Sequence, residues 1–261
     1  LYLAMRQFYL GGCLLIEKNN MNLHLNHKHI LKDISLKIPI SGEIIGIMGP
    51  NGAGKSSLLK SLIGTFNASG EMYLYGKSIH KQLQYITYIP QKAQLDLDFP
   101  INVEKVILSG CYQTIGWFKC VDHASKTKFQ TLIRDLDLEA LQYKQISELS
   151  GGQLQRVLVA RALMSDSTVY LLDEPFVGID FNSEQLIMKK LRQLKAQGKL
   201  ILIVHHDLSK TEDYFDRILL LNRTVRFFGP SHQAMHPQYL NRTFLFNMTS
   251  TFNEGSDISN D

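Results

Sequence analysis

The stretch that decides the fold of this chain is Gly49-Pro50-Asn51-Gly52-Ala53-Gly54-Lys55-Ser56-Ser57. The apolar run at 43–48 has the length and branched content of a buried strand, and residues 57–63 have helical spacing that ends at Gly64. A glycine-rich loop between a strand and a helix can turn its backbone N–H groups toward a polyphosphate, at the positive end of the helix. Lys55 would add a positive charge and Ser56 a hydroxyl for magnesium. The alternative is a chance glycine-rich turn, and the flanking strand and helix argue against it.

The composition is that of an ordinary globular protein. Of its 261 residues, 44% are hydrophobic and 20% are charged, which allows a sizeable core. The net charge of +4 comes without a basic block, so no nucleic-acid partner is predicted. Cys13, Cys111 and Cys120 are too scattered for a disulfide framework, which favours a reducing compartment. No run of about 18 apolar residues occurs, so no spanning segment is predicted, and residues 1–10 lack the basic start of a signal peptide.

A pair of acids stands at the end of another apolar strand. Residues 169–172 lead directly into Asp173-Glu174-Pro175. Carboxylates at the tip of a buried strand are costly to desolvate unless they bind something. In nucleotide hydrolases the first acid holds magnesium and the second can polarise the attacking water. The alternative is a strand that leaves the core and exposes both acids.

A second glycine-containing segment precedes a helix. Leu149-Ser150-Gly151-Gly152-Gln153 leads into a strongly helical run at 154–164, and its start would form a second anion-binding terminus. Taken alone, this pattern favours an ordinary N-capped helix. The phosphate loop elsewhere in the same chain supports the other interpretation, an anion-binding helix start. A strand predicted at 199–204 then delivers His205-His206-Asp207, where a histidine could reach the phosphates or cap the next helix.

The other elements are predicted from periodicity and turn residues. Antiparallel strands are expected at 14–17, 21–25 and 34–38, further strands at 71–75, 86–89, 217–222 and 225–228, a helical insertion over 102–141, and a helix at 182–197 capped by Asn182 and Ser183. His24, His27 and His29 suggest a metal site, but strand alternation would place His27 and His29 on one face and His24 on the other. A solvated hairpin is therefore favoured there.

Together these segments resemble the ATP-binding subunit of ABC transporters, from about Leu15 to about Tyr239. The matching positions are the phosphate loop Gly49 to Ser57, the Q-loop glutamine Gln91, the family signature Leu149 to Gln153, the magnesium aspartate Asp173, the catalytic glutamate Glu174, the D-loop aspartate Asp180 and the switch histidine His206 rather than His205. The resemblance implies an α/β fold: a P-loop NTPase (RecA-like) core with an antiparallel β subdomain and an inserted α-helical subdomain. Residues 14–240 would form this single ATPase domain, with 14–94 and 167–230 as core and β subdomain, 95–166 as helical subdomain, and 1–13 and 241–261 as poorly defined termini.

The resemblance also implies a site and its ligands. ATP and Mg²⁺ are the expected cofactors, with Ser56, Gln91 and Asp173 at the metal and Glu174, His206 and Gln91 in catalysis. The expected nucleotide-binding residues are Gly49, Pro50, Asn51, Gly52, Ala53, Gly54, Lys55, Ser56 and Ser57, joined by Ser150, Gly151, Gly152, Gln153 and Asp180. The segment 150–153 would come from a second copy of the chain, so that two copies sandwich two nucleotides.

One position departs from the family pattern. Leu25 stands where family members place an aromatic residue on the adenine ring. Stacking on the base would therefore be weaker, or would come from His27 or His29. The triphosphate chemistry would be unaffected.

A narrower likeness concerns the transported substrate. Asp98-Phe99-Pro100 with Gly116-Trp117-Phe118 resembles subunits that energise the uptake of manganese, zinc or iron. The expected partners are a second copy, an integral membrane permease at Phe99, Pro100, Trp117 and Phe118, and indirectly an extracellular metal-binding receptor. The chain would lie peripherally on the cytoplasmic side of the cell membrane. For each aromatic residue, the alternative is a place in the insertion's own core.

Other functions stay open on the sequence alone. The ATPase of a siderophore, haem or cobalamin importer would share these motifs. So would a soluble family member acting in DNA repair or ribosome rescue, although such proteins usually carry coiled-coil, zinc or second-cassette insertions that this sequence does not show. A histidine-rich metal sensor built on residues 24–29 is a further alternative. The sequence does not identify the transported metal, because the substrate would touch the permease and the receptor.

Overall fold

The computed structural model describes residues 15–91, 99–112 and 121–245 of the chain. Its strands are β1 (Leu15–Leu25), β2 (Lys28–Pro39), β3 (Ile44–Met48), β4 (Glu71–Leu74), β5 (Lys77–Ser78), β6 (Ile86–Ile89), β7 (Val169–Asp173), β8 (Leu200–Val204), β9 (Arg217–Asn222) and β10 (Thr224–Pro230). Its α-helices are α2 (Lys55–Leu62), α3 (Val103–Ser109), α5 (His123–Asp135), α6 (Gly151–Met164), α7 (Phe181–Ala196), α8 (Thr211–Tyr214), α9 (Ser231–Ala234) and α10 (Pro237–Leu240). Short 3-10 turns lie at Ile79–Lys81, Leu83–Tyr85, Glu139–Leu141, Ile146–Glu148 and Leu208–Lys210, and a π-helical turn at Asn241–Leu245. None of the helices in these ranges is both long enough and apolar enough to cross a membrane.

A six-stranded sheet forms the centre of the fold, in the order β10-β9-β3-β8-β7-β6. Its strands pair in parallel except for β10, which runs antiparallel to β9 at one edge. Every residue of β3, β7 and β8 is buried. Parallel strands that are covered on both faces need the continuous apolar runs that the sequence contains. The prediction of an α/β fold around the strand at 43–48 is therefore confirmed.

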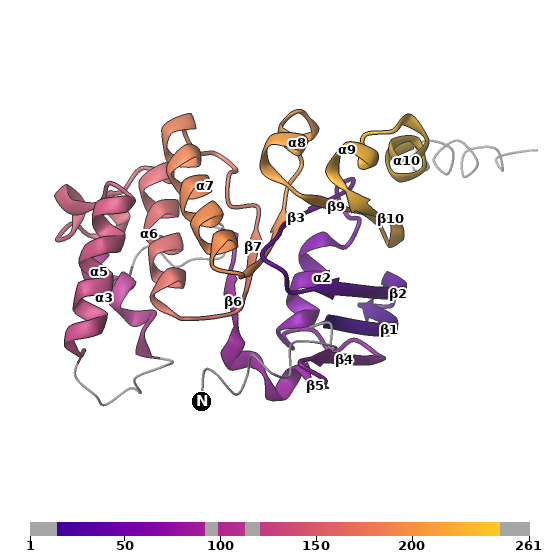
Figure 1. The fold of residues 1–261 in the computed structure, drawn as a ribbon, viewed down its shortest axis with the longest axis horizontal. Coiled ribbons are helices and arrows are strands. Elements are labelled where there is room, and N and C mark those ends of the chain that lie inside the picture. Colours follow the sequence, from indigo (N-terminus) through magenta and orange to yellow (C-terminus); the bar gives the residue numbers. More distant parts are fainter. Residues whose placement is uncertain (1–14, 92–98, 113–120, 246–261) are drawn as a thin grey trace, which may run out of the picture.

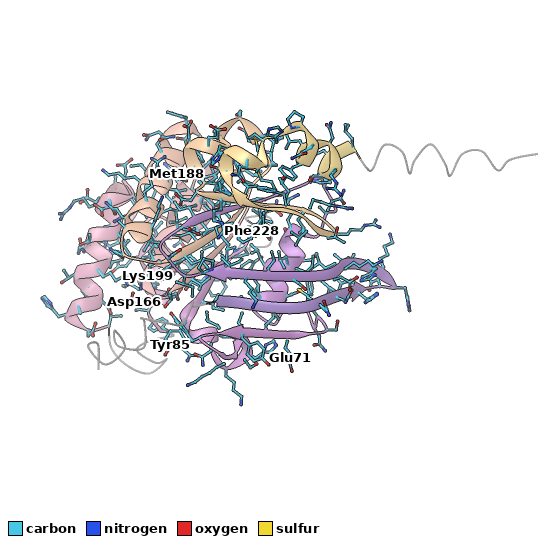
Figure 2. All side chains as sticks on the ribbon, turned by 45° about the vertical axis from the view of Figure 1, so that its right-hand side comes forward. Glu71, Tyr85, Asp166, Met188, Lys199 and Phe228 are labelled. Atoms are coloured by element: carbon cyan, nitrogen blue, oxygen red, sulfur yellow. The ribbon has the colours of Figure 1, made fainter. Side chains whose placement is uncertain are left out.

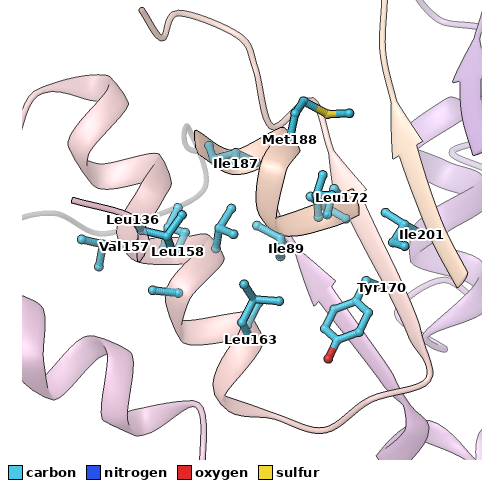
Figure 3. Close-up of a cluster of buried hydrophobic side chains, with 14 of the residues drawn as sticks. Ile89, Leu136, Val157, Leu158, Leu163, Tyr170, Leu172, Ile187, Met188 and Ile201 are labelled. Atoms are coloured by element: carbon cyan, nitrogen blue, oxygen red, sulfur yellow. The ribbon is translucent and has the colours of Figure 1, made fainter. Parts of the chain in front are cut away.

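The two faces of this sheet carry separate hydrophobic cores (Figure 1). On the face covered by α6 and α7, Ile89, Leu172 and Ile201 pack with residues of both helices (Figure 3). On the face covered by α2, Leu171 is among the buried residues. Successive side chains of a strand point to opposite faces, so Leu171 and Leu172 enter different cores. By the same alternation, Asp173 leaves β7 on the face of Leu171, toward α2.

A four-stranded antiparallel sheet, in the order β2-β1-β4-β5, lies on the α2 side of the molecule (Figure 1). The strands predicted at 14–17 and 21–25 join into one strand, β1, because a register shift near Asn20, whose φ is 51°, lets the chain continue without a break. Glu71 marks the start of β4 in this sheet, and Tyr85 ends the turn that precedes β6 (Figure 2). The predicted antiparallel subdomain is confirmed, whereas the strand at 86–89 belongs to the parallel sheet beside β7.

The histidines of the β1–β2 hairpin lie differently from the prediction. Asn26 and His27, with φ of 47° and 63°, form the two-residue turn. His24 stands directly opposite His29, and the two rings stack with centroids 4.0 Å apart, so they share one face of the hairpin. The prediction applied the side-chain alternation of a single strand to residues on both sides of the turn. Residues that stand opposite each other on paired strands always lie on the same face of the sheet. His24 and His27 are exposed, as a solvated hairpin requires, and the described ranges hold no group of three or more His, Cys, Asp or Glu that could bind a metal.

The helical insertion between β6 and β7 contains α3, α5 and α6, which stand side by side at one end of the molecule (Figure 1). Asn102 and Asp122 cap α3 and α5 through their side-chain oxygens. The buried Arg156 of α6 donates to two backbone carbonyls just beyond the end of α5, which joins the two helices. Trp117 and Phe118, predicted as permease contacts, lie outside the described residues.

Two features of the C-terminal half differ from expectation. Asp180, and not the predicted Asn182 or Ser183, caps α7: its Oδ1 accepts the N–H of Ser183 over 2.8 Å. A cap needs an extended backbone just before the first helical residue, and Asp180 has it, with φ of −74° and ψ of 159°. At the far end, Nδ2 of Asn222 donates to the carbonyl of the buried Thr243 over 2.8 Å, so the segment 241–245 packs on β9.

Candidate active site

The phosphate-loop segment lies between β3 and α2, as the sequence predicts. Gly52 and Gly54 have φ of 78° and 93°, in the left-handed region that favours glycine. A Cβ on Gly54 would also lie 2.6 Å from Cδ2 of Leu31, because β2 packs against the loop. The first N–H groups of α2 have no partner within the helix, so the loop and helix together can bind an anion.

Lys55 is the first residue of α2, and it is only 7% exposed. Its Nζ donates to the carbonyl oxygens of Gly49, at 2.9 Å, and Pro50, at 3.0 Å. Burial lowers the pKa of its ammonium below the usual value, while the carboxylates of Glu174 and Asp173 act in the opposite direction. The structure therefore keeps a cation and two acids close together at the end of the phosphate loop.

Of the three residues expected at magnesium, Ser56 and Asp173 are in contact, whereas Gln91 bonds to Glu174. Oγ of Ser56 donates to Oδ1 of Asp173 over 2.7 Å, and Asp173 is 1% exposed. A second hydroxyl, Oη of Tyr88, donates to Oδ2 of the same carboxylate over 3.1 Å. Hydroxyl and carboxylate oxygens are the ligands that Mg²⁺ prefers, so the oxygens of Ser56 and Asp173 fit the ion.

Sequence reasoning missed Tyr88. Its role depends on the pairing of β6 with β7, which the sequence does not reveal: Tyr88 stands opposite Leu171 and therefore shares a face with Asp173. Burial, together with the neighbouring Asp173 carboxylate, raises the pKa of the Tyr88 phenol. The phenol thus stays protonated and acts as the donor.

Gln91 and Glu174, two of the three residues expected in catalysis, are also in contact. Nε2 of Gln91 donates to Oε2 of Glu174 over 2.7 Å. Glu174 has a φ of 51°, a left-handed conformation that costs a residue with a side chain on the order of 1–3 kcal/mol. Such backbone strain concentrates at functional sites, where the surrounding structure holds it.

The two histidines after β8 lie in different environments. His206 is exposed, whereas His205 is 3% exposed and packs edge-on or tilted against Phe176, Tyr214 and Phe215. Burial, with a smaller effect from His206, lowers the pKa of His205 to about 4, so its ring is neutral near pH 7. Nε2 of His205 is buried and has no hydrogen-bond partner among the described residues. His205 therefore belongs to the core, and His206 is the one that can meet a ligand.

The signature segment forms a second cluster, at the start of α6. Ser150 caps this helix: its Oγ accepts the N–H of Gln153 over 3.3 Å, and Oε1 of Gln153 accepts the N–H of Ser150 over 2.9 Å. A Cβ on Gly152 would lie 2.3 Å from Oδ2 of Asp180, which caps α7. The starts of α6 and α7 thus pack closely, and they bring the predicted Ser150, Gly152, Gln153 and Asp180 together.

Several known proteins are similar to this chain in sequence or in fold. A family model described as "ABC transporter" matches residues 31–177. The chain is 38% identical to the manganese transport system ATP-binding protein MntB of Halalkalibacterium halodurans, over 93% of this chain and 96% of that protein. It is 41% identical to the zinc transport system ATP-binding protein TroB of Treponema pallidum, over 90% of this chain and 89% of that protein. A solved structure of an ATP-binding subunit of an ABC transporter shares the fold, with a TM-score of 0.75 at 22% identity, over 92% of this chain and 99% of that one.

Proposed function

The chain belongs to the ABC transporter family, and we propose that it is the ATP-hydrolysing subunit that powers import of manganese, zinc or iron through a membrane permease. The observation that carries the proposal is the identity of 38% and 41%, over nine-tenths of the chain, to ATP-binding proteins of manganese and zinc transport systems. As a member of this family, the chain is an ATP-binding ATPase.

The nucleotide would bind at the phosphate loop, residues 49–57. The N–H groups at the start of α2 and the ammonium of Lys55 would hold its phosphates. Lys55 bonds to the carbonyls of Gly49 and Pro50, within the same loop, and this position supports the assignment. Leu25 and the neighbouring hairpin would contact the base.

Mg²⁺ would be held by Ser56 and Asp173, with Gln91 completing the set. When bound, the ion supplies charge neutralisation between the phosphates during phosphoryl transfer. The contact between Ser56 and Asp173, at 2.7 Å, supports this assignment because it brings the two oxygen donors together.

Glu174 would orient or deprotonate the attacking water. Its contact with Gln91 supports a shared task, since an amide donor fixes the direction of the carboxylate. His206, exposed after β8, would contact the γ-phosphate and hold the arrangement in the transition state. Positioning of this kind is the main source of catalysis in phosphoryl transfer.

A second copy of the chain would complete the site. Ser150, Gly151, Gly152 and Gln153 would meet the partner's nucleotide, with Asp180 beside them. Val177 and Phe181 flank Asp180 and are 36% and 70% exposed, which suits a surface that another protein covers. ATP would then favour the closed pair of chains, and hydrolysis would remove that preference.

The helical insertion would contact the permease. Phe99 is 62% exposed and Tyr143 is 76% exposed, and Ile146 donates its N–H to the carbonyl of Ile101, so the segments that carry these aromatics are joined. Phe99 and Pro100 remain proposed contacts, and Tyr143 joins them. The chain would thus lie peripherally on the cytoplasmic side of the membrane, with the extracellular receptor acting through the permease. No nucleic-acid partner is proposed.

The test is transport by the assembled complex. The tagged full chain, purified in detergent from its own cells, is expected to bring a membrane permease with it. In vesicles, with the receptor, this complex should take up radioactive Mn²⁺, Zn²⁺ or Fe²⁺ when ATP is supplied on the side of this chain. Glu174→Gln should abolish uptake, and Glu212→Gln, an exposed change on α8, should not.

Two outcomes would overturn the proposal. ATP-dependent uptake of a siderophore, haem or cobalamin without uptake of the free ions would show that the metal is the wrong cargo. An ATPase that purifies without any permease would favour a soluble member of the family.

A further inference from the structure

We propose that Tyr88 is a positioning residue for the magnesium aspartate, one that fixes the Asp173 carboxylate through a hydrogen bond from its phenol. The inference rests on the proposed function, because it assigns Asp173 to Mg²⁺. Tyr88 lies in none of the segments that the sequence singled out for chemistry. It would touch neither nucleotide nor metal, and it would act only through Asp173.

The position of Tyr88 follows from the sheet. β6 and β7 are parallel neighbours, and Tyr88 stands opposite Leu171 in their register. Asp173 is two residues beyond Leu171, so both side chains lie on the α2 face. Oη of Tyr88 donates a hydrogen bond to Oδ2 of Asp173 over 3.1 Å, slightly longer than is usual between two oxygen atoms.

The need for a second donor follows from what Ser56 has to do. Ser56 now donates to Oδ1 of Asp173 over 2.7 Å. If Oδ1 also binds the ion, it has to be shared between the ion and the Ser56 hydroxyl. Tyr88 donates to the other oxygen, Oδ2, so it can hold the 1% exposed carboxylate in place while Oδ1 is used for the ion. Hydrogen bonds of this kind to a ligating carboxylate orient it and tune the affinity for the metal.

Tyr88 also connects the two acids at the tip of β7. Gln91, three residues further along the same segment, donates to Glu174. The strand β6 and the residues that follow it therefore hold both Asp173 and Glu174, each by one hydrogen bond. A displacement of this segment would move the metal ligand and the water-orienting carboxylate together.

The experiment compares Tyr88→Phe with Tyr170→Phe in the full chain. Tyr170 is a matched control: it lies on β7, it is 2% exposed, and its hydroxyl donates to the carbonyl of Ser165 on the opposite face of the sheet. For each variant, the affinity for a fluorescent ATP analogue is measured in EDTA and at saturating Mg²⁺. The ratio of the two affinities reports metal coupling and does not depend on turnover.

Tyr88→Phe is expected to lower this ratio about tenfold while the affinity in EDTA stays within about twofold of the parent. Tyr170→Phe should leave the ratio unchanged. An unchanged ratio for Tyr88→Phe would overturn the proposal. A purely structural role predicts this result, because it would weaken binding of the analogue equally in EDTA and in Mg²⁺, or not at all.

Asp173→Asn separates a failure of this inference from a failure of the proposed function. If Asp173→Asn collapses the ratio and Tyr88→Phe does not, only the role of Tyr88 is wrong. If Asp173→Asn leaves the ratio of the parent intact, the magnesium assignment itself is wrong, and Tyr88 loses its role with it.

Discussion

Nε2 of Gln91 lies 2.7 Å from Oε2 of Glu174, so the amide at the end of one strand of the parallel sheet holds the carboxylate at the end of the next. The two residues are 83 positions apart in the chain. They meet because β6 and β7 pair in parallel and both end at the same edge of the sheet. A substitution at either residue therefore changes the surroundings of the other.

Glu174→Gln should reduce ATP turnover at least about 100-fold, because an amide cannot accept the proton of the attacking water. The substituted amide keeps an oxygen that can accept from Gln91, so ATP affinity should stay close to that of the parent. Steady-state hydrolysis and equilibrium binding of a fluorescent ATP analogue measure the two effects. Glu212→Gln on α8 is the control, and hydrolysis at the parental rate by Glu174→Gln would remove Glu174 from its role.

Lys55→Met should weaken ATP binding by tenfold or more, on the order of 1.5–3 kcal/mol for a lost charged hydrogen-bond donor. The same substitution at Lys60, on the same helix, is the matched control, since Lys60 lies over the ring of Phe66 and outside the loop. Titration with the fluorescent analogue gives both affinities. Equal affinities for the two variants would contradict the assignment of Lys55 to the phosphates.

Ser150→Arg should prevent ATP-driven dimerisation and spare binding of ATP to the monomer. Because Ser150 also caps α6, the variant should lose about 1 kcal/mol of unfolding free energy. Gln145→Arg, a change at another exposed position before a short 3-10 turn, controls for the added charge. Light scattering with ATP in a Glu174→Gln background gives the mass, and a normal mass shift for Ser150→Arg would count against the sandwich.

Acid should destabilise the protein partly through His205. Its pKa is about 4 in the folded chain against an ordinary value of 6.5, so between these values the unfolded chain binds a proton that the folded chain does not. The stability is complete above pH 6.5 and is lost as the pH falls toward 4, by roughly 3 kcal/mol.

His205→Phe, which fills the site with an apolar ring, should flatten this dependence between pH 6.5 and pH 4. Urea denaturation at a series of pH values measures it, with His232→Phe on the exposed surface of α9 as control. Parallel curves for the parent and His205→Phe would show that His205 titrates normally.

Much of the fold was predictable from local patterns. The loop at 49–57, its flanking strand and helix, the apolar strand before Asp173 and the capped start of α6 all depend on neighbours in the chain. Local periodicity failed at the ends of elements, where a turn or a cap decided the outcome. The stacked His24 and His29 and the cap of α7 at Asp180 are two such cases.

The sequence by itself determined the chemistry available to this protein: a phosphate loop, a cation, two acids on a strand tip and a second helix start. Only the tertiary structure decided which of these groups meet. Ser56, Tyr88 and Asp173 meet because three separate segments approach the same side of the sheet. His205 is buried because it packs against rings from other segments just beyond the end of β8, whereas His206 is exposed. The sequence says which side chains are present, whereas contacts between distant residues depend on how the strands pair and how the helices pack.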